Sequence, residues 1–287
     1  MNEGLRVLVT GASGRIGAAV CAALADAGHD VHGLDSRPSP QAGIVADLLD
    51  APALRRALAG IDAVVHVAAL HAPHVGQQPD AEFLRVNVDG TRALLDAAAG
   101  AGVRRIVFTS TTALYGAGQR AAEAALWVDE DTPPAPVTIY HRSKLTAEAL
   151  LEEAAAQGGP TLRVLRMGRC FDEAPALMAV YRLQRGVDAR DVADAHRLAL
   201  QHTGPPSSRF VLAFPTPFRR DDAAGLGHDA AAVIARREPE LAAAFAARGW
   251  TLPSRIDRVY DAGRAVAELG WRPRHGWRSV LQTASAG

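Results

Sequence analysis

The feature of this sequence that most restricts its fold is a regular alternation of short apolar runs with longer amphipathic stretches. Apolar runs rich in β-branched residues occupy 5–10, 62–69, 104–110 and 161–167, and apolar residues recur at helical spacing in the stretches that follow them. Strands that are apolar throughout and alternate with helices form parallel sheets covered by helices on both faces. The sequence therefore predicts an α/β fold with a doubly wound parallel sheet.

A glycine-rich segment joins the first predicted strand to the first predicted helix. In "VTGASGRIG", residues 9–17, the glycines are Gly11, Gly14 and Gly17. Glycines in this context allow a tight turn, a close approach of the backbone to a pyrophosphate and close packing of the helix on the strand. The N-terminus of the helix also offers unpaired N–H groups to the phosphates. This segment predicts a Rossmann-type dinucleotide site.

The end of the second predicted strand indicates which dinucleotide binds. Asp35 ends "DVHGLD", where a carboxylate can accept hydrogen bonds from both hydroxyls of the adenosine ribose. Arg37 lies two residues further on and could contact a 2′-phosphate, which would admit NADP. The carboxylate of Asp35 would repel that phosphate. We therefore predict NAD as the cofactor and regard NADP as the weaker alternative.

A tyrosine and a lysine stand four positions apart at the start of the helical stretch "IYHRSKLTAEALLEE", residues 139–153. This spacing places Tyr140 and Lys144 one turn apart on the same helix face. Read alone, the stretch fits a surface helix with a solvated Lys144–Glu148 pair. Beside a dinucleotide site, the ammonium could instead lower the phenol pKa and make Tyr140 a general acid or base.

The alternation loses its regularity after Met167. We predict a dinucleotide-binding Rossmann domain over residues 1–167 and a mixed region over 168–287, which holds a small substrate-binding portion. Within the mixed region, a helix at 191–202 and a strand at 209–214 are expected to return to the Rossmann core.

Charge and cysteine usage exclude several other classes of protein. With 31 basic and 31 acidic residues and no basic stripe, neither nucleic acid nor a membrane surface is an expected partner. Apolar runs fall well short of the roughly 18 residues that a membrane span requires. Cys21 and Cys170 form no CxxC pair, and the histidines have no metal-ligand spacing, so we expect a cytoplasmic protein without a metal.

Four motifs in this order resemble the extended short-chain dehydrogenase/reductases, the NAD-dependent epimerase/dehydratase family. They are "TGASGRIG", "NVDGT" at 87–91, "TSTTALYG" at 109–116 and "YHRSK" at 140–144. The resemblance implies that Tyr140 is the catalytic acid or base and that Lys144 tunes it while it binds the nicotinamide ribose. It also selects Thr111, rather than Ser110, as the catalytic hydroxyl.

The resemblance also implies a set of cofactor contacts. Asp47 matches a position that contacts the adenine amino group, and a structural role for Asn87 is about as well supported as a catalytic one. The predicted cofactor-binding residues are Gly11, Ser13, Gly14, Arg15, Ile16, Gly17, Asp35, Asp47, Leu48, Ala68, Ala69, Leu70, Asn87, Tyr140 and Lys144.

Departures from the family's sequence patterns restrict the choice among the family's reactions. Sugar dehydratases of this family carry Asp-Glu directly after the catalytic threonine, whereas Thr112 and Ala113 follow Thr111, so dehydration is disfavoured. Residues 163–178, "RVLRMGRCFDEAPALM", resemble the uronate dehydrogenases locally. The arginine with which those enzymes hold the sugar carboxylate falls here on Leu177. Either Arg182 or Arg185 would have to replace it, or the substrate has no carboxylate.

The short segment between the sixth strand and the helix at 191 leaves little chain to hold a second nucleotide. We therefore expect oxidation or reduction of a small sugar, sugar acid or similar alcohol. The predicted substrate contacts are His71, Thr111, Thr112, Arg182 and Arg185. A nucleotide-sugar epimerase, with residues 215–255 as a nucleotide site, remains an alternative. A non-catalytic dinucleotide-binding redox sensor is a second one, although such relatives commonly lack the tyrosine or the lysine.

The resemblance further implies a homodimer. Helices expected at 81–101 and 140–156 are long and rich in alanine. In the family, the equivalent pair packs against its copy to form a four-helix contact. A monomer with alanine-rich outer helices is the alternative.

Overall fold

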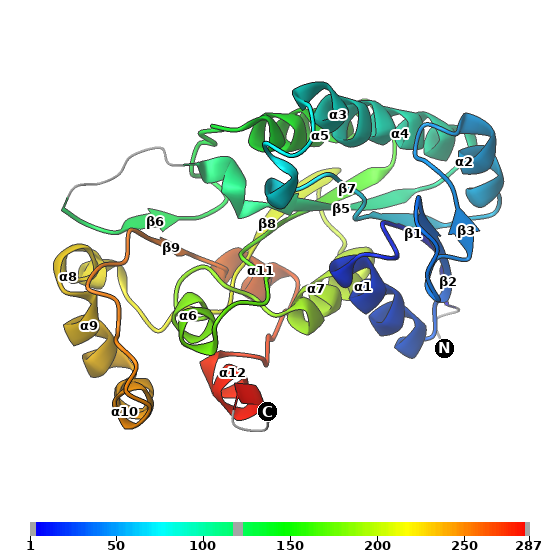
Figure 1. Ribbon diagram of the computed structural model, residues 1–287. Helices are drawn as coiled ribbons and strands as arrows, with labels where there is room; N and C mark the ends of the chain where they lie inside the picture. The colour runs from blue at the N-terminus through cyan, green and yellow to red at the C-terminus, as the bar shows by residue number, and fades with distance from the viewer. Residues whose placement is uncertain (1–3, 117–122, 285–287) are drawn as a thin grey trace.

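A seven-stranded sheet lies at the centre of the computed structural model, which describes residues 4–116 and 123–284 (Figure 1). Its strand order is β3-β2-β1-β4-β5-β7-β8, and all of the neighbouring strands are parallel. The strands are β1 (Arg6–Thr10), β2 (Asp30–Asp35), β3 (Ile44–Val45), β4 (Ala63–His66), β5 (Arg105–Thr111), β7 (Thr161–Met167) and β8 (Ser207–Leu212). The order reverses between β1 and β4, so the predicted doubly wound sheet is confirmed.

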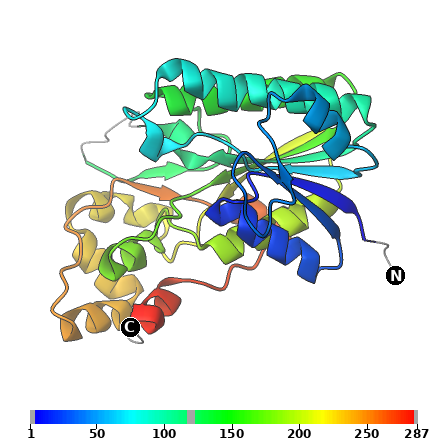
Figure 2. The same ribbon diagram turned by 45° about the vertical axis from the view of Figure 1, so that its right-hand side comes forward.

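Helices cover both faces of the sheet, as Figures 1 and 2 show. One face carries α1 (Arg15–Asp26), α7 (Ala189–Gln201) and α11 (Gly263–Glu268), and the other carries α2 (Ala51–Ala57), α3 (Asp80–Leu84), α4 (Gly90–Gly100) and α5 (Ile139–Ala156). Each face buries its own apolar cluster against the strands. The β-branched strand residues therefore pack on both sides, which explains why these strands read as continuous apolar runs.

The helix expected at 81–101 is interrupted. Between α3 and α4 the chain forms a π-helical turn over Arg85–Asp89. A π-turn is a local widening of the helix that periodicity does not reveal, and it is frequent at functional sites. Here it contains Asn87, whose side chain binds the loop after β4.

The C-terminal part adds a further apolar cluster. Three short helices, α8 (Ala223–His228), α9 (Ala230–Arg237) and α10 (Pro239–Ala247), contribute to it together with α6 (Pro175–Tyr181) and α12 (Trp277–Ala284). A two-stranded parallel sheet of β6 (Leu126–Val128) and β9 (Arg258–Tyr260) lies between this cluster and the main sheet (Figure 1). The chain returns to the large sheet through α7, which packs on α1, and β8, which pairs with β7.

None of the helices in residues 4–116 and 123–284 combines the length and the apolar character that a membrane crossing requires.

Candidate active site

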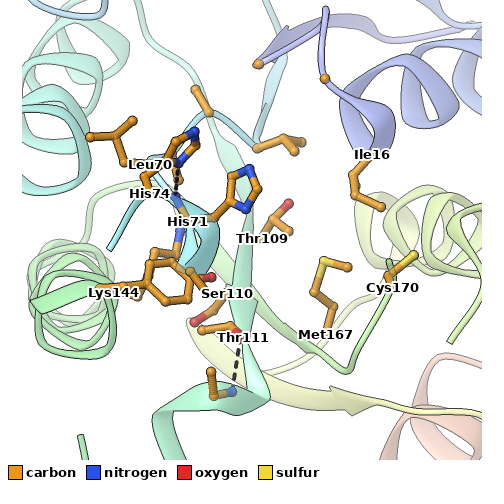
Figure 3. A pocket seen from close by; sticks show the side chains of 18 of the residues that line it. Ile16, Leu70, His71, His74, Thr109, Ser110, Thr111, Lys144, Met167 and Cys170 are labelled. Carbon is orange, nitrogen blue, oxygen red and sulfur yellow. Dashed lines mark hydrogen bonds between the residues drawn. The ribbon is translucent and has the colours of Figure 1, made fainter. Parts of the chain in front are cut away.

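A cavity of about 1070 Å³ opens at the carboxyl ends of the central strands (Figure 3). In doubly wound sheets, this edge is where ligands bind. Typical small-molecule sites have volumes of roughly 300–1,000 Å³. The cavity is therefore large enough for a dinucleotide beside a small second molecule.

The glycine loop forms one wall of this cavity. Gly11 has a positive φ of 73°, and a Cβ atom on it would lie 2.7 Å from the backbone nitrogen of Ala68. A Cβ atom on Gly17 would lie 2.0 Å from the Gly11 carbonyl oxygen, whereas one on Gly14 would lie 3.3 Å from that same oxygen. The loop therefore requires glycine at 11 and 17. Because these glycines have no side chains, the N-terminus of α1 faces the cavity unobstructed. Its free N–H groups suit a pyrophosphate.

Asp35 lies at the end of β2, with only 8% of its surface exposed, and it also lines the cavity. Its carboxylate accepts hydrogen bonds from the backbone nitrogens of Ser13 (3.0 Å) and Arg37 (2.9 Å). The Ser13 hydroxyl instead binds Arg37 O and Ser39 Oγ, and Ser13 does not line the cavity. Ser13 thus orients Asp35 through its backbone.

The opposite end of the predicted dinucleotide site contains a side chain that sequence reasoning missed. Asp47 and Leu48, two of the predicted cofactor contacts, line the cavity, and Arg85 from the π-helical turn joins them. Arg85 Nη1 lies 3.2 Å from Asp47 Oδ2, and its other contacts are with Glu82. Because Arg85 comes into reach only through the π-turn, no sequence pattern indicated it.

Of the other predicted cofactor contacts, residues 68–70 line the cavity, but Asn87 does not. The Asn87 amide donates to Leu70 O (2.9 Å) and to Ser143 Oγ (2.9 Å), and its oxygen accepts from Leu70 N (2.8 Å). Of the two roles left open for Asn87, the geometry favours the structural one. It fixes the loop after β4 against α5.

The tyrosine and lysine of α5 face the same cavity. The helix begins directly after Thr138, whose hydroxyl accepts from His141 N, and it turns Tyr140 and Lys144 inward. Both side chains are buried, and Lys144 Nζ lies 3.9 Å from the centroid of the Phe108 ring. Thr111 stands at the end of β5, also against the cavity. The structure therefore brings together Thr111, Tyr140 and Lys144.

The pKa values of this pair differ from the sequence expectation. Burial raises the pKa of Tyr140 to about 12, and a hydrogen bond with Thr111 opposes this rise. Burial lowers the pKa of Lys144 to about 7, and Glu148 opposes this change. The expected lowering of the tyrosine pKa is thus absent in the protein alone. The reason is that both groups are desolvated, so the ammonium is itself only partly charged near neutral pH.

One buried hydroxyl in the cavity lacks a partner. Ser110 Oγ makes no hydrogen bond in residues 4–116 and 123–284, although Ser110 lines the cavity. Its neighbour Thr109 has a partner, because Thr109 Oγ1 lies 2.7 Å from His196 Nε2. A buried polar group without a partner costs about 1–3 kcal/mol. A bound molecule that hydrogen-bonds Ser110 would remove this penalty, so the site fits a polar ligand.

The remaining end of the cavity lies beyond Thr111. Of the predicted substrate contacts, His71, Thr112 and Arg185 line it. Arg182 does not line this cavity, which corrects its proposed role. Its guanidinium donates to His275 O and pairs with Asp188, because this arginine turns towards the C-terminal segment. Asp257, Arg258 and Tyr260 also line the cavity, and no sequence pattern indicates their involvement.

Two other expectations concern histidines and metals. His66 is a satisfied core histidine, as expected, because its ring nitrogens lie 2.7 Å from Thr10 Oγ1 and 2.9 Å from Thr91 Oγ1. Among the residues that the structure describes, no three histidine, cysteine or acidic side chains are grouped as metal ligands would be.

A Rossmann-type sheet, a glycine loop and an inward-facing tyrosine and lysine on one helix define a dinucleotide-dependent enzyme of the short-chain dehydrogenase type. Residues 7–172 match the NAD dependent epimerase/dehydratase family. The chain belongs to this family and is an NAD-dependent oxidoreductase or epimerase of the extended short-chain type.

Similar proteins include two curated epimerases. An N-acetyl-alpha-D-glucosaminyl-diphospho-ditrans,octacis-undecaprenol 4-epimerase of Escherichia coli O157:H7 is 38% identical over 157 residues, which is 53% of this chain but only 44% of that protein. A UDP-glucose 4-epimerase of Azospirillum brasilense is 27% identical over 321 residues, covering 94% of this chain and 88% of that protein. The chain thus spans less than half of the first relative and most of the second.

A solved structure is similar over almost the whole chain. It is a short-chain dehydrogenase/reductase superfamily protein from Agrobacterium tumefaciens with bound NAD. The TM-score is 0.73 and the identity 26%, with 98% of this chain and 96% of that chain covered.

Proposed function

We propose that this chain is an NAD-dependent oxidoreductase that acts on the carbinol or carbonyl carbon of a small sugar-like molecule. The observation that carries this proposal is the convergence of Tyr140, Lys144 and Thr111 on the cavity that also contains the glycine loop and Asp35. NAD, when bound, supplies the hydride acceptor or donor. The protein supplies binding, orientation and the transfer of a proton.

The residues on the dinucleotide side fit NAD. The glycine loop leaves space for the pyrophosphate, and Asp35 presents a buried carboxylate for the ribose hydroxyls. The Arg37 side chain is 74% exposed, and its Nε lies 3.9 Å from Asp35 Oδ1. Arg37 also lines the cavity, so the support for NAD over NADP comes from the Asp35 carboxylate, which would repel a 2′-phosphate.

The proton is handled by Tyr140. Because its pKa is raised, the phenol holds its proton at neutral pH and can donate it to a substrate oxygen during carbonyl reduction. In the oxidative direction, Tyr140 must begin as the phenolate, which accepts the hydroxyl proton of the substrate and becomes a phenol, and a positive charge on Lys144 stabilises that phenolate before the proton arrives. We infer that the Thr111 hydroxyl orients the substrate oxygen towards Tyr140, because both residues line the cavity.

The residues that line the cavity restrict the size of the substrate. The segment between β7 and α7, residues 168–188, contains only the short helix α6. Within the described chain, no residue of α8, α9 or α10 lines the cavity. Residues 215–255 therefore offer no wall for a second nucleotide, which supports a sugar, sugar acid or similar alcohol as the substrate.

A second candidate is epimerisation of a nucleotide-linked sugar. Its support is the whole-chain likeness to a UDP-glucose 4-epimerase. Such an enzyme would use the same Tyr140 and Lys144 but would return the hydride to the same substrate. It would therefore produce no net NADH.

The test is NADH production by the purified protein over a panel of sugars, sugar acids and small alcohols. Tyr140→Phe should lower kcat by about 10²-fold or more, because the proton relay is lost. It should bind NAD almost as well as the wild type, because the ring still packs, and this binding is the control for folding. A variant that keeps more than about a tenth of the wild-type kcat would contradict the mechanism.

A further inference from the structure

The end of the cavity beyond Thr112 contains three charged side chains that the proposed chemistry does not use. They are Arg185, Asp257 and Arg258, and all three line the cavity. Two arginines face one carboxylate, so the cluster has an excess of one positive charge. Another arginine that lines the cavity, Arg169, is bound through two nitrogens to Glu173 and is therefore neutralised.

Hydrogen bonds and ion pairs hold the three side chains of this cluster in fixed positions. Asp257 accepts from Arg185 Nη2 through one oxygen and from Arg258 Nε (2.9 Å) through the other. The Arg185 guanidinium also lies 5.3 Å from the centre of the Tyr181 ring. Asp257 stays ionised, because the two arginines hold its pKa below the usual value despite the opposing effect of burial. Asp257 therefore acts as an internal counter-ion that fixes both arginines.

Two contacts tie this cluster to the catalytic side of the cavity. Arg258 Nη1 donates to Gly116 O, and Tyr260 OH donates to Thr112 O (3.2 Å). Thr112 directly follows Thr111, and Gly116 ends the turn that begins there. The arginines thus lie beyond the catalytic hydroxyl, on the side away from the glycine loop.

We propose that Arg258, assisted by Arg185, binds the carboxylate of the substrate, which is a sugar acid with a single negative charge. The inference rests on the proposed oxidoreductase function and gives it a substrate class. It replaces Arg182, which faces away from this cavity, with an arginine from β9.

The charge of the cluster selects this class over the alternatives. The side chain of Arg258 is only 10% exposed, so a neutral sugar would leave the excess positive charge buried without compensation. A sugar nucleotide diphosphate has two negative charges, so it would overcompensate the single excess positive charge. A carboxylate matches the charge and the planar geometry of a guanidinium.

Calorimetric titration of the NADH-loaded protein, which cannot oxidise the probes, tests the proposal. The probes are D-glucuronate and D-galacturonate, the neutral methyl ester of each, and UDP-glucose. The wild type should bind at least one of the two acids roughly tenfold more tightly than its ester, as a charge-assisted hydrogen bond implies. Arg258→Met should bring the acid and the ester to within about twofold of each other, and Arg258→Lys should restore part of the difference. Arg278→Met, which removes a surface arginine paired with Glu240, is the matched control and should keep the wild-type ratio.

Several outcomes would overturn the assignment. These are equal binding of acid and ester, a ratio that survives Arg258→Met, tighter binding of UDP-glucose than of either acid, or no binding of either acid. Failure of the proposed function is seen separately, because it would appear as absent NAD binding or as an unimpaired Tyr140→Phe enzyme. A protein that binds NAD and needs Tyr140, but does not select the acid, would contradict only the carboxylate site.

Discussion

Glu148 and Arg166 form a bidentate ion pair in the core, and Glu148 lies one helical turn beyond Lys144. Arg166 Nε lies 3.1 Å from Glu148 Oε1 and Nη2 lies 2.6 Å from Oε2, and both side chains are only 2% exposed. Arg166 Nη1 also donates to Tyr115 OH (2.9 Å). The pair joins α5 to β7, and its carboxylate is the group that opposes the loss of charge on Lys144.

Removing one member of this pair should destabilise the protein strongly. Glu148→Leu leaves the Arg166 guanidinium buried without its counter-ion, and a loss of about 3–5 kcal/mol is expected. The double variant Glu148→Leu with Arg166→Met removes both charges and should be more stable than the single one. Urea unfolding of the three proteins provides the measurement. A single variant as stable as the double one would show that the pair is not a coupled unit.

Lys144 should make stability depend on pH in a defined direction. Its pKa is 10.5 when unperturbed and about 7 in the folded protein. Between these values, the unfolded chain holds a proton that the folded protein has lost, so wild-type stability rises with pH across this window. Below it, the buried ammonium opposes folding to its full extent.

Lys144→Met should therefore stabilise the NAD-free protein at pH 7, by about 1–4 kcal/mol, while it lowers both activity and NAD affinity. The gain should shrink as the pH approaches 10, because the wild type then buries a neutral amine. Urea unfolding at several pH values checks this. A gain that does not change with pH would mean that packing, rather than the charge of Lys144, is responsible.

The parts of the site that could be predicted from sequence are those set by local geometry. Tyr140 and Lys144 share a helix face because of their spacing alone, and the glycine loop follows from its place between a strand and a helix. Arg258 could not be found in this way. Its strand has three residues and, within the part of the chain that the structure describes, pairs with β6 alone, so its position depends on long-range packing.

Arg182 and Arg185 illustrate the same limit. They lie three residues apart in the segment directly after α6, and no sequence pattern distinguishes them. The structure directs Arg182 to His275 O and Asp188, and Arg185 to Asp257 in the cavity. The difference arises from contacts with the C-terminal segment, which no local pattern contains.

Asp35 should control the choice of cofactor. Asp35→Ala removes a carboxylate that faces the cavity, and NAD affinity should fall roughly tenfold or more, as expected for a lost hydrogen bond to a charged group. NADP should lose less, because the repulsion of its phosphate disappears and Arg37 is nearby. Titration of wild type and variant with both dinucleotides measures the ratio. A wild type that already prefers NADP would refute the assignment of NAD.

The glycine loop offers a comparison between two substitutions of equal size. Gly17→Ala would place a methyl group 2.0 Å from the Gly11 carbonyl oxygen, so the helix must move and NAD affinity should fall sharply. At Gly14 the corresponding distance is 3.3 Å, and a small adjustment suffices. We expect Gly14→Ala to retain much more NAD binding than Gly17→Ala. Equal losses would indicate that packing of α1 on the loop is not what shapes the site.

The outer helices give the last prediction, which concerns assembly. The segment α3–α4 and helix α5 lie side by side on one outer face of the molecule (Figure 1), and Leu84 in α3 is 45% exposed. We predict that this face packs against its copy, so that light scattering at micromolar concentration gives about twice the 30.2 kDa of one chain. Leu84→Asp would bury a charge in that contact and should shift the mass towards a single chain. Leu177→Asp, at a residue of α6 that is 40% exposed, is the matched control and should leave the mass unchanged. A wild type with the mass of one chain would refute the dimer.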